Sequence, residues 1–329
     1  MRIAIVRLSA LGDIIQSMIV LQFIKKQFPN AEIHWYVDDR FSQILHDNED
    51  INQVISLNIT NIKRKKSVIG FFKMLISLRN QEKYDLAIDL QGLVKSAVIT
   101  RFIPALRRFG FDKYSSRESF SSYFYSDLFR ISYENNVIMR YISLVNFALG
   151  FKTSENEIRN KKPLLNLEKK NTKKKPKILV IPGASFPSKI YSEENYAKVI
   201  NYLKIDSEVI WNSEKERLMA IKIKKLSPNV QITQSKNLSD LKQIILRSDL
   251  VIGGDTGPTH LAWALNIASI TIFGSTPQYR NSFGTEINHS VASDNEINVY
   301  KINKYCDNIN NIDPKKIADI SDRILNNDL

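Results

Sequence analysis

The chain of 329 residues has one cysteine, Cys306, and four histidines. A single cysteine cannot form an intrachain disulfide, so we expect a protein of the reducing cytoplasm that depends on its packed core. There is no cysteine cluster and no pair of histidines at metal-ligand spacing, so the sequence predicts neither a metal site nor a cofactor. Walker-type, Gly-x-Gly-x-x-Gly and Gly-x-Ser-x-Gly loops are also missing, which argues against P-loop, classical dinucleotide-binding and serine-hydrolase chemistry.

Long apolar runs are absent as well. A membrane span requires roughly 18–20 apolar residues, and the nearest run, residues 137–150, is interrupted by Arg140 and Asn146. The segment before Arg7 is too short for the apolar region of a signal peptide. We therefore expect a soluble chain, or one that lies on a membrane surface.

What the chain has in excess is positive charge, with 47 Lys and Arg against 34 Asp and Glu and a net charge of +13. Such a surface attracts polyanions, namely nucleic acid, anionic lipid headgroups or phosphorylated ligands. Part of the excess is compositional, but the clusters Lys63–Lys66 and Arg107–Arg108 stand beside apolar segments. Aromatic residues do not alternate with these clusters, so charge alone is a weak argument for nucleic-acid binding.

Short β-rich apolar runs alternate with helical patterns along the chain. The runs are continuous, as in parallel strands that helices cover on both faces, so we predict an α/β protein with doubly wound parallel sheets. The expected strands are residues 2–8, 32–37, 84–91, 177–183, 207–211, 249–255 and 268–274, and the expected helices include 14–28, 68–80 and 192–203.

A lysine-rich segment with few apolar residues divides the chain. We place one Rossmann-like domain at residues 1–160, a basic linker at 161–176 and a second such domain at 177–312. Residues 313–329 are expected to form a terminal helix, and the first domain is one surface on which that helix can pack. The two domains are expected to face each other across a cleft.

Ligands of doubly wound sheets bind beyond the carboxyl ends of the strands, and the strongest such loop is VIGGDTGPTHLAWAL, residues 251–265. Its proline fits the first turn of a helix, whose backbone N–H groups and partial positive charge suit a diphosphate. Asp255, Thr256 and Gly257 lie at the helix start, and His260 is near enough to reach the same ligand. The alternative is that Asp255 only caps the helix and that His260 is a packed or solvated histidine.

Three further loops follow strands. In IPGASFPSKIY, Gly183 allows close backbone approach, Ser185 supplies a hydroxyl and Lys189 offers a compact positive charge for phosphate oxygens, unless it is simply solvated. Glu214, after another strand, can bind ribose hydroxyls or cap a helix. In RLSALGDIIQS, Asp13 either caps the first helix or does chemistry at the expected cleft.

Four stretches together resemble a known family: LSALGD after the first strand, YDLAIDLQGLVKSA, SSRESFSSYFY and GGDTGPTHLAWAL. They are similar to glycosyltransferase family nine, the ADP-heptose:lipopolysaccharide heptosyltransferases. The resemblance covers essentially the whole chain, and DLQGLVKSA and the SSRES region make it greatest to the heptosyltransferase I branch. It implies the GT-B architecture, with an N-terminal acceptor-binding domain and a C-terminal domain that binds ADP-heptose.

The resemblance further implies transfer of L-glycero-D-manno-heptose from ADP-heptose to the inner Kdo of Kdo2-lipid A at the cytoplasmic face of the inner membrane, with inversion and without a metal. Asp13 would be the general base. The residues implied for the donor are Ser185, Lys189, Thr256 and Gly257 at the diphosphate, Glu214 at the ribose, and Asp255 and His260 completing the pocket. The residues implied for the acidic acceptor are Lys63, Arg64, Lys66 and Arg117.

Other functions stay open at this point. Within the family, the alternative is heptosyltransferase II or another transferase with a different acceptor. From a different class, the alternative is a nucleotide-sugar-binding protein that has lost catalysis, which the presence of Asp13 disfavours. A nucleic-acid-binding protein is the weakest alternative, because the chain lacks a recognition element.

Overall fold

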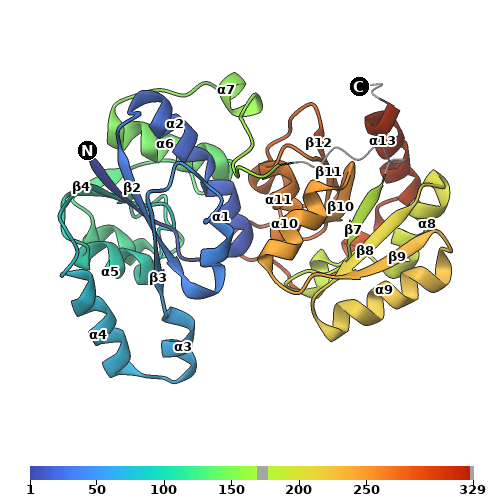
Figure 1. Ribbon diagram of the computed structural model, residues 1–329, viewed down its shortest axis with the longest axis horizontal. Helices are drawn as coiled ribbons and strands as arrows, with labels where there is room; N and C mark the ends of the chain where they lie inside the picture. The colour runs from blue at the N-terminus through green and yellow to red at the C-terminus, as the bar shows by residue number, and fades with distance from the viewer. Residues whose placement is uncertain (169–176, 327–329) are drawn as a thin grey trace. The chain divides into compact units, whose positions relative to one another are not determined.

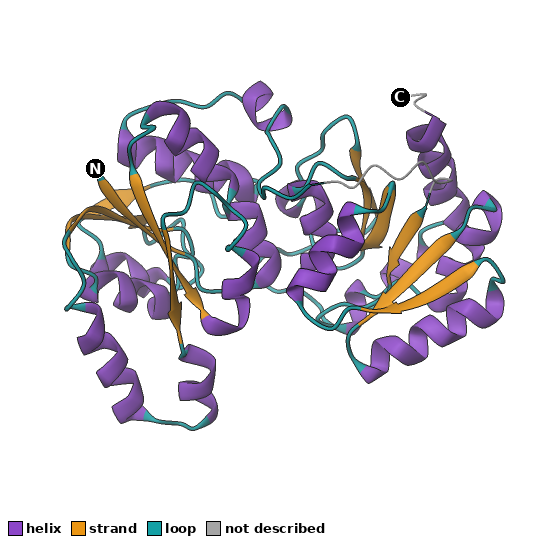
Figure 2. Cartoon of the chain, in the orientation of Figure 1, coloured by secondary structure: helices purple, strands orange, loops and turns teal. Residues whose placement is uncertain are grey.

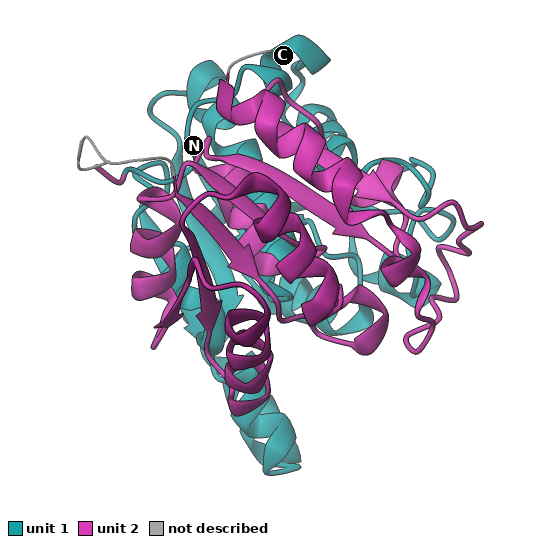
Figure 3. Cartoon of the chain, turned by 90° about the vertical axis from the view of Figure 1, so that its right-hand side faces the viewer, with its two compact units in different colours: residues 1–166 teal, residues 167–329 magenta. Residues whose placement is uncertain are grey.

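The computed structural model describes residues 1–168 and 177–326. The chain forms two compact units, unit 1 at Met1–Asn166 and unit 2 at Leu167–Leu329, which Figure 3 colours separately. Each unit contains a six-stranded sheet in which every pair of neighbouring strands is parallel, with helices against the sheet (Figures 1 and 2). The predicted doubly wound α/β class is confirmed.

In unit 1 the strand order is β3-β2-β1-β4-β5-β6. The chain runs outward in one direction from β1 and in the other from β4, so the loops after these two strands flank the topological switch point. The strands are β1 Arg2–Val6, β2 Glu32–Asp38, β3 Gln53–Leu57, β4 Tyr84–Asp89, β5 Ala105–Phe111 and β6 Asp127–Phe129. The helices are α1 Leu11–Ser17, α2 Ile19–Gln27, α3 Ile59–Arg64, α4 Val68–Leu78, α5 Val94–Phe102, α6 Val137–Leu149 and α7 Glu155–Arg159, with 3-10 turns η1 Asp39–Ile44 and η2 Ser119–Phe124.

Unit 2 repeats this topology with the order β12-β11-β10-β7-β8-β9, and its switch point lies between β7 and β10. The strands are β7 Ile178–Ile181, β8 Ser207–Trp211, β9 Val230–Gln234, β10 Leu250–Gly254, β11 Ala268–Phe273 and β12 Asn288–Ala292. The helices are α8 Glu193–Leu203, α9 Glu214–Leu226, α10 Leu238–Leu246, α11 Gly257–Ala264, α12 Gln278–Asn281 and α13 Pro314–Asn326, with 3-10 turns η3 Pro187–Lys189 and η4 Asn308–Asn311.

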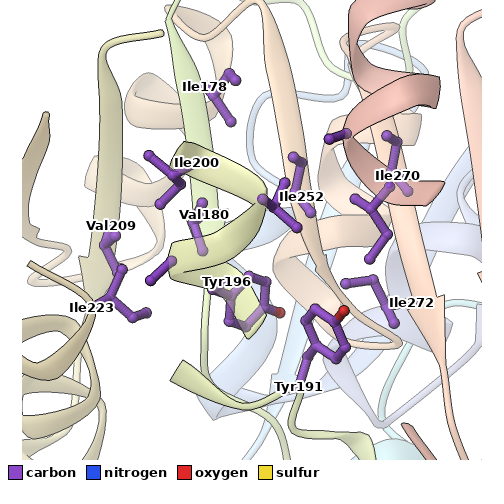
Figure 4. Close-up of a cluster of buried hydrophobic side chains, with 14 of the residues drawn as sticks. Ile178, Val180, Tyr191, Tyr196, Ile200, Val209, Ile223, Ile252, Ile270 and Ile272 are labelled. Atoms are coloured by element: carbon purple, nitrogen blue, oxygen red, sulfur yellow. The ribbon is translucent and has the colours of Figure 1, made fainter. Parts of the chain in front are cut away.

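The core of unit 2 packs β-branched side chains of the central strands against α8, α9 and α13 (Figure 4). Two tyrosines are buried within it, with their rings edge-on at 5.2 Å. The Tyr191 hydroxyl donates to the Ile312 carbonyl at 2.7 Å, and the Tyr196 hydroxyl donates to the Ile181 carbonyl at 3.1 Å. Both polar tips are therefore paired, which removes the penalty of burying them.

The C-terminal helix and the linker differ from expectation. Helix α13 buries Ile317 and Ile324 in the core of unit 2 and packs on α8 and β11, so the suggestion that it returns to the N-terminal domain is corrected. Leu164 and Leu165, placed in the expected linker, are buried, and the Asn48 amide donates to the Leu164 carbonyl at 2.6 Å. Unit 1 therefore continues to residue 166, and linker residues 169–176 lie outside the described part.

Candidate active site

The loops after β7 and β10 meet at the switch point of unit 2. A Cβ atom on Gly254, the last residue of β10, would collide with the backbone carbonyl oxygen of Lys189 in η3. Only glycine lets the two loops approach this closely. The second glycine of the GGDTG stretch therefore brings Lys189 next to the start of α11.

The Asp255 carboxylate contacts side chains from the segments that follow β7, β10 and β11. Its Oδ2 atom lies 2.7 Å from Lys189 Nζ, 2.7 Å from Thr276 Oγ1 and 3.2 Å from Asn281 Nδ2. Its Oδ1 atom lies 2.9 Å from His260 Nε2. Asp255 is thus the centre of a polar cluster rather than a simple helix cap.

Burial alone would raise the pKa of Asp255, but the Lys189 ammonium and the His260 hydrogen bond hold it well below its usual range. The carboxylate is therefore ionised and only accepts hydrogen bonds, so the Nε2 atom of His260 carries the proton in this contact. Asp255 fixes the orientation of both side chains. It acts as their positioning residue.

The Lys189 ammonium is held from two further directions. It donates to the Asp255 backbone carbonyl at 3.1 Å and lies 4.9 Å from the centroid of the Phe186 ring. The side chain is largely buried. A compact charge fixed in this way suits anionic ligand oxygens and is not the freely solvated lysine of the alternative.

Helix α11 begins at the same place. Thr256 is its N-cap in extended conformation, and the first intrahelical bond is donated by the His260 amide to the Thr256 carbonyl at 3.1 Å. Backbone N–H groups before that bond have no acceptor within the helix. Thr256 and Gly257 are half-buried, so the positive end of the helix lies beside the Lys189–Asp255 pair.

Ser185 and Glu214 lie outside the buried cluster around Asp255. Ser185 is exposed in the loop after β7. The Glu214 side chain is 67 % exposed and pairs with Arg217 on α9 at 2.7 Å. Nor does Glu214 cap that helix, because the Ser213 hydroxyl is the cap.

The carboxylate that borders the loop after β7 belongs to Glu216. A Cβ on Gly183 would collide with this carboxylate. Glu216 Oε2 accepts from the backbone amides of Asn212 at 2.8 Å and Ser213 at 2.9 Å, which closes a capping box. The Ser-x-x-Glu spacing was the sequence signal that distinguishes Glu216 from Glu214.

In unit 1, Asp13 lies in the first turn of α1, the helix that follows β1. Its Oδ2 atom lies 2.7 Å from Arg7 Nη2 and accepts from the Ala10 amide at 3.3 Å. The side chain remains 43 % exposed. Asp13 therefore supports the helix start, as in the first alternative, and still presents its carboxylate to solvent.

Arg7 holds Asp13 from the interior. Its Nη1 atom donates to the Leu90 carbonyl at 3.0 Å, and its guanidinium lies over the Tyr141 ring. Burial would lower the pKa of Arg7, but Asp13, Tyr141 and Asp89 raise it. The guanidinium therefore stays charged and fixes one side of the Asp13 carboxylate.

The DLQGLVKSA stretch, residues 89–97, supports the loop between β1 and α1. Gln91 Oε1 accepts from the Leu8 amide at 2.8 Å. Asp89 is buried and accepts from the Tyr125 hydroxyl at 2.7 Å and from the Gly92 amide at 3.2 Å, and burial raises the pKa of Asp89. The motif residues Asp89 and Gln91 thus support the Asp13 loop from within unit 1.

The residues expected at the acceptor lie on two segments of unit 1. Lys63 and Arg64 end α3, Lys66 follows in the turn before α4, and Arg117 follows β5. All four are exposed. The Arg64 guanidinium also donates to Asn61 Oδ1 at 2.8 Å.

Lys95 is a further basic residue, which was not among the candidates predicted from the sequence. It lies half-buried in the first turn of α5. Burial lowers the pKa of Lys95, Asp38 opposes this, and the charges of Lys63 and Arg40 lower it further. Lys95 therefore belongs to the same electrostatic neighbourhood as Lys63.

Arg107 and Arg108 have structural roles instead. Arg107 pairs with Asp127 between β5 and β6. Arg108 donates to the carbonyls of Ile103 at 2.8 Å and Thr100 at 3.3 Å. Both guanidinium groups thus bind partners within unit 1.

Within residues 1–168 and 177–326, no group of three or more His, Cys, Asp and Glu side chains is arranged to hold a metal ion. No helix in those same ranges has the length and apolar character to cross a membrane.

Two doubly wound units, one with a buried Lys–Asp–His cluster at a helix start, are an arrangement suited to a two-domain enzyme that uses nucleotide-activated substrates. The sequence model of glycosyltransferase family 9 (heptosyltransferase) matches residues 72–307. Lipopolysaccharide heptosyltransferase 1 of Campylobacter coli is 40% identical over 316 residues, which cover 90% of this chain and 91% of the relative. The chain belongs to glycosyltransferase family 9, the heptosyltransferases.

Further similarities agree with this family. Lipopolysaccharide heptosyltransferase 1 of Escherichia coli K12 is 24% identical over 84% of this chain and 88% of its own. The solved structure of E. coli heptosyltransferase WaaC with ADP has a TM-score of 0.81 at 20% identity, covering 98% of this chain and all of that one. E. coli heptosyltransferase II has a TM-score of 0.75 at 18% identity. These structures confirm the predicted GT-B-type α/β fold.

Proposed function

We propose that this enzyme transfers L-glycero-D-manno-heptose from ADP-heptose to the inner Kdo of Kdo2-lipid A, with inversion at the anomeric carbon. The observation that carries the proposal is the buried Lys189–Asp255–His260 cluster at the start of α11. Similarity to lipopolysaccharide heptosyltransferase 1 of Campylobacter coli supports heptose transfer in lipopolysaccharide synthesis, and the likeness to E. coli WaaC with ADP supports an ADP-linked donor.

The donor diphosphate is bound by Lys189, by the hydroxyls of Ser185 and Thr256, and by the N–H groups at Gly257. ADP is a poor leaving group until its developing charge is neutralised, and a fixed ammonium with helix-terminal N–H groups neutralises it without a metal ion. Asp255 keeps Lys189 in place through the 2.7 Å contact. His260 completes the pocket.

The ribose of ADP is bound by Glu216 rather than Glu214. The Glu216 carboxylate borders Gly183 in the loop after β7, whereas the Glu214 carboxylate is held by Arg217 on an exposed helix face. Carboxylates accept hydrogen bonds from ribose hydroxyls, as in other doubly wound nucleotide-binding domains.

Asp13 is the general base that takes the proton of the attacking Kdo hydroxyl. A carboxylate is a weak base toward a free hydroxyl. It accepts the proton late, when the oxygen has become acidic through bond formation to an oxocarbenium-like carbon. Direct attack opposite the leaving diphosphate inverts the anomeric centre.

The acceptor is bound by the basic residues of unit 1. Kdo carboxylates and lipid A phosphates are acidic, and Lys63, Arg64, Lys66 and Arg117 are exposed cations. Lys95 adds a half-buried cation beside Lys63. Because this acceptor is lipid-linked, the enzyme works as a peripheral protein at the cytoplasmic face of the inner membrane.

The test measures ADP release by the purified protein with ADP-heptose and either Kdo2-lipid A or heptosyl-Kdo2-lipid A. We expect release with the first acceptor. Release with the second acceptor alone would assign the enzyme to a later heptosyl transfer. Binding of ADP-heptose without release on either acceptor would indicate a non-catalytic binding protein.

A further inference from the structure

Helix α4 has apolar side chains on its solvent side. Val68, Ile69, Phe72 and Ile76 are each between 56 and 72 % exposed. Ile69, Phe72 and Ile76 are spaced three and four residues apart, so they form one continuous stripe along the helix. A solvent-facing stripe of this kind marks an interaction surface.

This stripe is not the face by which α4 joins unit 1. Leu75 and Leu78 are buried, and Phe71 and Met74 are partly buried against the same core. That inner face packs on α5. Helix α4 is therefore apolar on two sides, and only one of them is covered by unit 1.

The charge around the stripe has a single sign. No Asp or Glu occurs between residues 51 and 81. The cations of the same segment are Lys63, Arg64, Lys65, Lys66, Lys73 and Arg79. Four of them directly precede α4, whose N-cap is Ser67, and α3 and α4 together lie at one extremity of unit 1 (Figure 1).

We propose that α3 and α4 form a membrane-docking element, in which Ile69, Phe72 and Ile76 insert into the headgroup region of an anionic bilayer. An apolar stripe beside a run of cations fits such a surface. The apolar side chains are buried at the boundary between headgroups and acyl chains, and the anionic headgroups attract the basic side chains. The choice of a bilayer rests on the proposed function, in which the acceptor is lipid-linked.

The same charges disfavour a second copy of the chain as the occupant. A symmetric dimer through this face would bring two identical cationic segments together without an acidic residue between 51 and 81 to pair with them. Self-association is therefore an outcome that would contradict the proposal.

The first experiment measures co-sedimentation of the protein with vesicles of pure phosphatidylcholine or of phosphatidylcholine with phosphatidylglycerol. We expect binding to the anionic vesicles that weakens with added salt. The variant Ile69→Ser/Phe72→Ser/Ile76→Ser should bind at least about tenfold more weakly. The matched control is Tyr202→Ser/Leu218→Ser/Leu226→Ser, which changes helix residues of unit 2 that are 45 to 57 % exposed, and it should bind like the wild type.

A second measurement does not depend on loss of binding. Phe72→Trp should shift its emission to shorter wavelength with anionic vesicles and be quenched by brominated acyl chains, whereas Leu218→Trp should not. Equal binding by the wild type and the α4 triple variant would overturn the proposal. So would a concentration-dependent dimer that the triple variant abolishes.

Activity separates this inference from the proposed function. With a deacylated, water-soluble acceptor, the α4 triple variant should turn over at the wild-type rate. With Kdo2-lipid A in anionic vesicles, its apparent KM should rise at least about tenfold. If the wild type uses neither acceptor, the proposed function fails, while vesicle binding still decides the role of α4.

Discussion

The Nζ atom of Lys189 lies 2.7 Å from Oδ2 of Asp255, and both side chains are largely buried. Each charge depends on the other, because removing an ion from water costs several kcal/mol, much of which the oppositely charged partner offsets. The pair therefore fixes an ammonium group at the start of α11 in advance of any ligand. Preorganised charge of this kind stabilises a leaving group without reorganisation during the reaction.

Replacing Lys189 by Met should lower kcat/KM for ADP-heptose by about 10²–10³, because the developing diphosphate charge loses its counter-charge. The variant should also be less stable by about 3–5 kcal/mol, since Asp255 is left as a buried charge without its ammonium. Steady-state kinetics and urea unfolding measure the two effects. Lys198→Met, an exposed change on α8, is the control, and equal loss in both variants would remove the assigned role.

We expect Asp255 to make the free energy of unfolding fall in acid. Its pKa is lower in the folded chain than its ordinary value, so its contribution is complete above the ordinary carboxyl pKa of about 4. That contribution falls as pH drops below this value, because the unfolded chain then binds the proton first. Urea unfolding at pH 7, 5, 4 and 3 should show a shallower acid loss in Asp255→Asn than in the exposed-site control Asp319→Asn. Identical slopes would contradict the prediction.

The sequence predicted the strands that are buried on both faces. Strands β1 and β10 are continuous apolar runs, whereas five strands were missed, and they lie away from the sheet centres. Strand β9, Val230–Gln234, carries exposed glutamines, and β5, Ala105–Phe111, carries two arginines. A strand with polar side chains on one face does not form a continuous apolar run, so the apolar pattern does not predict it. The expected helix 14–28 is two helices joined at Met18.

The residues of the candidate site were likewise predicted only in part. Loops after central strands could be found because topology places ligands there, and they contain Asp13, Lys189 and Asp255. Glu216 was not a candidate because the first acidic residue after β8 was chosen, whereas the capping box places the carboxylate of the second beside Gly183. Lys95 was missed because its half-burial depends on how α5 packs against residues distant in sequence.

Glu216 and Glu214 should behave differently. Glu216→Gln is expected to raise the KM for ADP-heptose about tenfold with little change in kcat, because a ground-state hydrogen bond to ribose is weakened. Glu214→Gln should leave both constants unchanged, since its carboxylate pairs with Arg217 on the exposed face. Calorimetric titration with ADP gives an independent measure. A larger effect of Glu214→Gln would restore the original assignment.

Asp13→Asn should strongly slow turnover while leaving donor binding intact. The amide keeps the shape of the side chain but cannot take a proton, so we expect kcat to fall by about 10²–10⁴. The Kd for ADP should stay within twofold, because Asp13 belongs to unit 1 and the proposed donor residues to unit 2. Asp39→Asn, exposed in η1, is the control. Wild-type turnover by Asp13→Asn would remove the general-base assignment.

We expect Lys161 to make the free energy of unfolding rise toward alkaline pH. The side chain is buried near the end of unit 1, and burial lowers the pKa of Lys161 to about 7. An unfolded lysine has a pKa of about 10.4, so between pH 7 and 10 the unfolded chain binds a proton that the folded chain lacks. Stability therefore increases with pH across this window.

The variant Lys161→Met removes the buried amine but keeps a side chain of similar length. Its Tm should rise less than that of the wild type between pH 7 and 10, because no lysine then has to be neutralised on folding. Lys162→Met, at the exposed neighbouring position, is the matched control. A Tm difference that is constant from pH 7 to 10 would mean that Lys161 is charged in the folded chain.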